Sequence, residues 1–258
     1  MQWWTIFQKE LLENWRSLKW VWVPIVFILL AIMDPITSYY TPVLLEQFGD
    51  LPEGAEINIP TPTPEQAFMS SISQYNLMGL LLILIMTMGL ISGERKSGVT
   101  ELILVKPVRY TNYITAKWAS TLLLVLTSSF LGLLASWYYI NILFGDLPFS
   151  HAMTGFLFHS VWYVLVITIS VFLNTLFRVP GLVGFLSVTS VIVLSSINGI
   201  FKSQFEWLPP QIHLYIQTFL NSGTLPTDMW ITTVLTILLS AILLMLSVFI
   251  FKKKELAS

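Results

Sequence analysis

The chain has 258 residues, of which 55% are hydrophobic and only 10% are charged, and its mean hydropathy is +0.75. Soluble domains carry about 25% charged residues, so this composition excludes a soluble domain and indicates one integral membrane domain. The formal net charge of −1 selects no class of partner, and the absence of cysteine excludes disulfides and thiolate metal sites.

The segment 1–19 has apolar residues at helical spacing and charged residues on its other faces. Its apolar positions are Trp4, Phe7, Leu11, Trp15 and Leu18. Tryptophan favours the membrane–water interface, so we expect an amphipathic helix lying in that interface. The alternative is a soluble helix that packs on a partner. Glu10 and Glu13 interrupt the apolar run, so the segment is not expected to be a cleavable signal peptide.

The first span is predicted over about 20–40, because at about 1.5 Å per residue this length crosses a hydrocarbon core of about 30 Å. Asp34 and Pro35 then lie in its outer part, where we expect a kink. Asp34 is the only acid inside a predicted span, and ionisable groups in spans are functional candidates. The alternative is that Asp34 lies at the outer water boundary, capped by Thr37 or Ser38.

The segment 41–71 is predicted to be an external loop, since it holds acidic residues but no lysine or arginine. It is interpreted either as a lid that contacts substrate or as a simple tether. A second span is predicted over about 72–91. Gly89 and Gly93 at its inner end form a pair of small residues suited to close helix packing.

The interval 92–117 is the longest charged stretch of the chain. Its basic residues are Arg95, Lys96, Lys106, Arg109 and Lys117. Basic loops stay on the cytoplasmic side, so this interval is predicted to be cytoplasmic. Residues 99–105 predict one short helix that ends before Pro107. Such a helix between two spans suits docking against another cytoplasmic protein, and the alternative is a plain loop.

Four further spans are predicted in the second half of the chain, at about 118–139, 154–177, 182–200 and 229–251. The segment 201–227 is broken by prolines and polar residues but rich in aromatic ones, which predicts short helices that dip into the outer interface. With six spans and both termini inside, twelve of the thirteen basic residues fall on the cytoplasmic side.

The cytoplasmic interval also carries a recognisable pattern. It reads Gly93-Glu94-Arg95-x-x-Gly98-x-Thr100-Glu101-Leu102, followed by Pro107-Val108-x-Tyr110 and Lys117. This pattern resembles the signature of ABC-2 type permeases, the membrane subunits of ATP-binding-cassette exporters. Val99 is a mild departure, because the family often has a small or polar residue at this point.

The resemblance implies an all-α fold with six transmembrane helices, an N-terminal interfacial elbow helix, a cytoplasmic coupling helix between spans 2 and 3, and external re-entrant helices before span 6. It implies two kinds of partner, an ABC ATPase subunit and a second permease in a homo- or heterodimer. The coupling residues that it assigns are Gly93, Glu94, Arg95, Gly98, Val99, Thr100, Glu101, Leu102, Pro107 and Arg109.

Polar groups on the predicted spans are candidates for a translocation pathway, although such groups also hold helices together. They are Asp34, Thr87, Ser128, Ser136, Asn174 and Asn198.

Motifs for catalysis on this chain are missing from the sequence. Gly93 and Gly98 have the spacing of a phosphate-binding loop, but Val99 replaces its lysine, so we expect no ATP site here. His151, His159 and His213 are isolated in sequence and form no His-Glu-x-x-His motif, so structural roles are expected for them. No catalytic residue, metal ion or nucleic-acid groove is predicted, and ATP and magnesium are expected on the partner ATPase.

The sequence therefore predicts a multi-pass permease subunit of an exporter in the plasma membrane, with both termini cytoplasmic. The alternative is a membrane binding, assembly or signalling protein without transport activity. An intramembrane enzyme is disfavoured because no nucleophile–base pair can be nominated.

Overall fold

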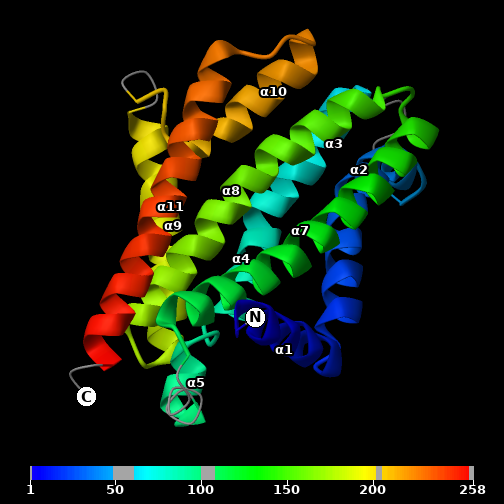
Figure 1. Cartoon of the computed structure of the whole chain (residues 1–258). Helices are drawn as coiled ribbons and strands as arrows, with labels where there is room; N and C mark the ends of the chain where they lie inside the picture. The colour runs from blue at the N-terminus through cyan, green and yellow to red at the C-terminus, as the bar shows by residue number, and fades with distance from the viewer. Residues whose placement is uncertain (1, 49–60, 100–107, 202–204, 256–258) are drawn as a thin grey trace.

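A computed structural model describes residues 2–48, 61–99, 108–201 and 205–255, and these ranges contain helices and turns but no strand. Within them, six helical segments are long and apolar enough to cross a membrane, which confirms the predicted all-α fold with six spans (Figure 1). These segments are Lys19–Pro42, Pro64–Lys96, Tyr110–Leu143, Phe149–Leu176, Pro180–Ile200 and Thr227–Lys254.

Helix α1 (Gln2–Arg16) lies across one end of the bundle (Figure 1). The face that it buries against the protein consists of Phe7, Glu10 and Asn14, spaced by three and four residues. Much of the predicted apolar face points away from the bundle, since Trp4 and Trp15 are 55% and 64% exposed. The helix is therefore anchored by its more polar side, which leaves the tryptophans free for the predicted membrane interface.

Helix α2 (Lys19–Phe48) follows α1 after a turn at Leu18, whose φ is 57°. The span predicted over about 20–40 agrees with the apolar segment Lys19–Pro42, but the helix itself continues to Phe48 with Pro35 and Pro42 inside it. Proline is tolerated within membrane helices, where neighbouring groups satisfy the freed carbonyls. Asp34 consequently lies well inside the helix.

The second span consists of three consecutive helical segments, which are α3 (Pro64–Gln74), the π-helical turn η1 (Tyr75–Gly79) and α4 (Leu80–Thr87). A capping box starts α3, in which the Thr63 hydroxyl accepts from the Gln66 amide and the Gln66 side chain accepts from the Thr63 amide.

The external loop predicted over 41–71 is helical at both of its ends. Helix α2 continues to Phe48 and α3 begins at Pro64, eight residues before the predicted start at residue 72. Residues 49–60 lie outside the described part of the chain. The alternating prolines of 60–64 suggested an extended segment, but the last of them, Pro64, instead occupies the first position of α3, where proline is well tolerated.

Helices α7 (Tyr110–Leu143) and α8 (Phe149–Leu176) form the centre of the bundle. In each, 56% of the most apolar stretch is buried, compared with 22% in α2. Helices α2 and α7 approach closely at Gly132, where a Cβ atom would lie 2.6 Å from the Phe27 carbonyl oxygen. The Tyr75 hydroxyl donates to the same carbonyl at 2.9 Å, so the π-helical turn joins this crossing.

Two short segments lie at opposite ends of the bundle. Helix α5 (Ser92–Lys96) lies at the end that holds α1, and α10 (Ile212–Ser222), preceded by the turn η2 (Pro209–Gln211), lies at the other (Figure 1). The last two spans are α9 (Pro180–Ile200) and α11 (Thr227–Glu255). Short helices thus occur within 201–227, and their depth in a membrane stays a prediction. The predicted helix over 99–105 falls almost entirely on residues 100–107, outside the described residues.

Candidate functional site

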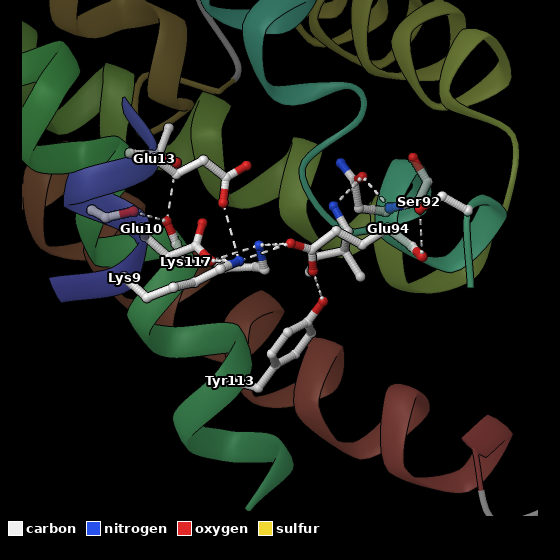
Figure 2. Close-up of polar contacts among 12 residues, drawn as sticks. Lys9, Glu10, Glu13, Ser92, Glu94, Tyr113 and Lys117 are labelled. Carbon is white, nitrogen blue, oxygen red and sulfur yellow. Dashed lines mark hydrogen bonds and ion pairs between the residues drawn. The ribbon is translucent and has the colours of Figure 1, made fainter. Parts of the chain in front are cut away.

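Polar side chains from α1, α5 and α7 meet at one end of the bundle (Figure 2). We call the following set the charged cluster: Lys9, Glu10, Glu13, Glu94, Tyr113 and Lys117. The Lys117 ammonium lies 2.9 Å from the Glu10 carboxylate and 2.8 Å from the Glu94 carboxylate. The Lys117 and Glu10 side chains are only 2% and 5% exposed. Buried charges are tolerated when they are paired and hydrogen-bonded, so Lys117 holds α1 and α5 against α7.

Glu94 is the residue through which α5 enters this cluster. One of its oxygens accepts from Lys117, and the other accepts from the Tyr113 hydroxyl, as Figure 2 shows. Its side chain is 15% exposed. We expected Glu94 to offer a charged contact to a partner, but here its carboxylate is engaged within the bundle and fixes the position of α5.

Lys9 lies at the edge of the cluster and is half exposed. Its ammonium is 3.0 Å from Glu10, 3.0 Å from Glu13 and 3.2 Å from Glu94. Burial alone would lower the pKa of Lys9, but the Glu10 and Glu94 carboxylates outweigh it and raise that pKa well above its usual value. Lys9 therefore stays protonated throughout the physiological pH range.

The three carboxylates of the cluster have the spacing of a metal site, since ligand oxygens of Glu10, Glu13 and Glu94 lie within 4.8 Å of one another. The ammonium groups of Lys9 and Lys117 already bind these carboxylates and supply the positive charge. The arrangement is therefore accounted for as an ion-pair network.

Asn174, near the end of α8, holds the break between α4 and α5. Its Oδ1 accepts from the backbone N–H groups of Ile91 and Ser92 at 3.1 and 3.0 Å. Its Nδ2 donates to the carbonyls of Thr87 and Ser170, both at 2.9 Å. One buried amide thus satisfies backbone groups that the interruption of the helix would leave unpaired.

The last turn of α8 receives cations from two other elements. Arg95 of α5 donates to the Thr175 carbonyl at 3.2 Å, and Lys254 of α11 donates to the Leu176 carbonyl. The Arg95 guanidinium also lies 5.5 Å from the ring centre of Phe251 in α11. Cations are favourable at a helix C-terminus, where carbonyls lack helical partners. Helix α5 is consequently tied to α1, α7, α8 and α11.

The family described as "ABC-2 family transporter protein" matches residues 4–256, nearly the whole chain. The chain belongs to this family. It is also 29% identical over 250 residues to an uncharacterized transmembrane protein, YxlG, of Bacillus subtilis (strain 168), and the similarity covers 97% of both chains. The ABC-2 assignment and the six apolar helices together support a permease role for this multi-pass membrane protein.

The predicted coupling residues of this ABC-2 protein divide into four groups. Gly93, Glu94 and Arg95 belong to α5, and the last two contact the bundle as described above. Gly98 has a φ of 76° just after α5, a conformation that glycine adopts without strain, and Val99 is 38% exposed. Arg109 is exposed at the start of α7. Thr100, Glu101, Leu102 and Pro107 lie outside the described residues.

Most of the predicted pathway residues lie inside the packed bundle. Thr87 pairs with Ser170 and Ser136 pairs with Ser71, each through hydroxyl groups 2.7 Å apart. Ser128 is buried and donates to the carbonyl of Leu124. Together with Asn174, these residues join helices or bond within them, which was the alternative interpretation of their polarity.

Asp34 and Asn198 are placed differently, because both are partly exposed on poorly buried spans. Within the described part of the chain, Asp34 has no hydrogen-bond or ion-pair partner, and an ionised carboxylate inside a span costs free energy. The Oδ1 atom of Asn198 is buried without a hydrogen-bond partner in the described structure. These two remain the pathway candidates that the bundle itself does not use.

A groove of about 510 Å³ runs between the second span and α9. Its polar residues are Asn76, Ser195 and Ser196, and the rest of its lining is aliphatic. Neither Asn76 nor the two serines were among the predicted pathway residues. The clustering of serines on one exposed stretch of α9 was the available signal.

Proposed function

We propose that this chain is the permease subunit of an ABC exporter and that a separate ATPase drives it from the α5 end of the bundle. The observation that carries the proposal is the anchoring of α5. The segment that carries the family pattern is tied through Glu94, Arg95 and Asn174 to four other helices. A force applied to this segment would therefore be passed to most of the bundle.

In this proposal, ATP and magnesium bind to the partner and not to this chain. Coupling requires the docking segment to bind the ATPase differently in its two nucleotide states, since a ligand shifts an equilibrium only by its differential affinity. Glu101 and Leu102 would contact the partner, and Glu94 and Arg95 would transmit the movement. The buried ion pairs suit transmission, because breaking them is costly.

The transport pathway in this proposal lies along the groove between the second span and α9. Asn76, Ser195 and Ser196 present polar groups on a side of the bundle that a single chain leaves open. Only 17% of the most apolar stretch of α9 is buried, so a second permease copy would complete the enclosure. The basic residues gathered around α1 and α5 support a cytoplasmic position for this end of the bundle. In the proposed orientation, both termini lie on the cytoplasmic side of the plasma membrane, and substrate is exported to the outside.

The coupling proposal is tested by reversing the charge of Glu101. Glu101→Arg would place like charges against the proposed ATPase and is expected to abolish co-purification of an ABC ATPase from the native host, together with permease-stimulated ATP hydrolysis. Removing one partner of a buried charged contact at an interface weakens the binding free energy by about 2–5 kcal/mol. Leu102→Ala is expected to weaken the complex in the same direction, by about 1–3 kcal/mol.

Glu206→Arg is the matched control, because it reverses an exposed charge at the opposite end of the bundle. Full recovery of the ATPase and full transport with Glu101→Arg would overturn the docking proposal. Failure of the unmodified chain to retain any such ATPase would instead favour a membrane assembly or signalling protein.

The orientation has its own test, since the chain contains no cysteine. Single cysteines introduced at Glu53 and at Ser258 are expected to lie on opposite sides of the membrane. An impermeant thiol reagent added to intact cells should label only the first. Labelling of both would overturn the proposed topology.

A further inference from the structure

Two histidines that are distant in sequence meet at the end of the bundle opposite the charged cluster. The ring of His159 in α8 and that of His213 in α10 have centres 5.2 Å apart and an interplanar angle of 78°. His159 is fully buried, and neither of its ring nitrogens has a hydrogen-bond partner in the described structure. The Nε2 atom of His213 is buried without a partner as well, although the residue as a whole is only partly buried. The two histidines are therefore neighbours in the fold, although they are isolated in sequence.

The groups packed around the pair are aromatic and uncharged. Tyr163 of α8 and Tyr75 of η1 have ring centres 4.5 and 6.1 Å from that of His159, and Trp162 lies 5.9 Å from His213. Both tyrosine hydroxyls donate to backbone carbonyls, so neither is a negative partner.

The carboxylates of the segments that flank α10 do not stabilise a protonated His213. Glu206, before η2, and Asp228, at the start of α11, interact electrostatically with Tyr215 of α10, and neither of them contributes to the pKa of His213. Burial lowers the pKa of His213 to about 4, against a smaller opposing effect of its hydrogen bond to the Pro210 backbone. A proton added to this docked imidazole would face a second imidazole and no counter-ion.

Helix α10 has turning points at both ends. Pro209 and Pro210 form η2 immediately before it, and Gly223, with a φ of 71°, ends it. Between them, α10 is held by apolar side chains, among which Ile216 packs against α8 near Gly155. Helix α10 also packs on α3 and α11, but its two ends allow it to move as a unit relative to all three helices.

We propose that η2 and α10 form a pH-responsive cover, in which protonation of His213 in acid releases α10 from its seat on α8. Neutral imidazoles allow docking, whereas an imidazolium is stable only when α10 moves and exposes His213 to water. The side of the membrane from which the proton arrives follows from the proposed orientation, which places this end outside. The release itself depends only on the two histidines and their surroundings.

The test uses the purified full chain in lipid nanodiscs, where both faces meet the same buffer. A single cysteine replaces buried Ile216 in one protein and exposed Thr218 of the same helix in another. The ratio of their maleimide labelling rates reports release of α10 and cancels the pH dependence of the thiol. With pKa values of about 6.5 when exposed and about 4 when docked, the ratio should rise roughly 30-fold between about pH 7.5 and about pH 5.0.

His213→Gln should remove this rise, because the amide takes up no proton. If His213→Gln does not elute like the unmodified protein in size-exclusion chromatography, His213→Asn takes its place and should likewise show no rise in the labelling ratio. His151→Gln is the matched control, since His151 also lies on α8 and contacts α10 through Phe219, with ring centres 5.1 Å apart. A flat ratio in the unmodified background, a rise that persists without His213, or a rise that vanishes with His151→Gln would each overturn the proposal.

Discussion

The two ends of this bundle treat their buried polar groups in opposite ways. At the α5 end, Lys117 has carboxylates 2.9 and 2.8 Å away, and the buried charges are paired. At the α10 end, His159 and His213 leave buried ring nitrogens without hydrogen-bond partners in the part of the chain that the structure describes. Removing one member of a buried ion pair costs about 3–5 kcal/mol, whereas an unsatisfied neutral group costs about 1–3 kcal/mol. Local rearrangement therefore costs more free energy at the α5 end than at the α10 end.

This contrast agrees with the two proposed roles, coupling to an ATPase at the α5 end and a movable cover at the α10 end. An end that receives force from an ATPase has to pass it on without yielding, and interlocked charges serve that purpose. An end that covers the opposite side has to open and close. The same helix, α8, contributes Asn174 to the first end and His159 to the second, so the two ends share one rigid element.

The largest effect is expected when the charged end loses its central cation. Lys117→Met would leave Glu10 and Glu94 buried with only Lys9 as counter-ion, at a cost of about 3–5 kcal/mol. We expect a clear drop in the apparent melting temperature in detergent. Lys96→Met, which removes an exposed cation from the same α5, should have almost no effect. Equal melting of Lys117→Met and the unmodified protein would show that the cluster does not hold this end together.

A smaller effect is expected from the amide at the break between α4 and α5. Asn174→Leu would leave the buried N–H groups of Ile91 and Ser92 without an acceptor, at a cost of about 2–4 kcal/mol. Hydrogen exchange over residues 88–96 should accelerate more than exchange in α7. Asn198→Leu is the matched control, because the Oδ1 of Asn198 has no partner to lose in the described structure. Similar exchange in both variants would mean that Asn174 does not fix α5.

Much of the fold could be predicted from the sequence, because apolar length and the sorting of basic residues depend on the chain alone. All six spans were found near their observed places. The boundaries failed where tertiary context decided them. Helix α2 continues beyond the predicted span to Phe48, and Pro64 starts α3 although the prolines of 60–64 suggested an extended segment.

The candidate site was predicted less well, because side-chain partners across the bundle are not visible in a linear pattern. Lys117 was assigned to the cytoplasmic side and to the family pattern, but its partner Glu10 is 107 residues away in the chain and was not predicted. One signal was available, since Glu10 falls three residues after Phe7 and four before Asn14 and so shares their helix face. The polarity of Asn174 was recognised, but its role at the break between α4 and α5 required the fold.

The smallest effect concerns Lys9, at the exposed edge of the charged cluster. Its pKa is raised in the folded protein, so its contribution to stability is complete below the unfolded pKa of about 10.4 and is lost as pH rises above that value. Because Lys9 is 45% exposed, solvent screens its ion pairs and the contribution should stay below about 1 kcal/mol. The difference in melting temperature between Lys9→Met and the unmodified protein should therefore be small near neutral pH, shrink in high salt and vanish at strongly alkaline pH. If the difference instead grew with pH, the lysine would act through packing of its aliphatic stem, and the ionic account of this end would apply to Lys117 alone.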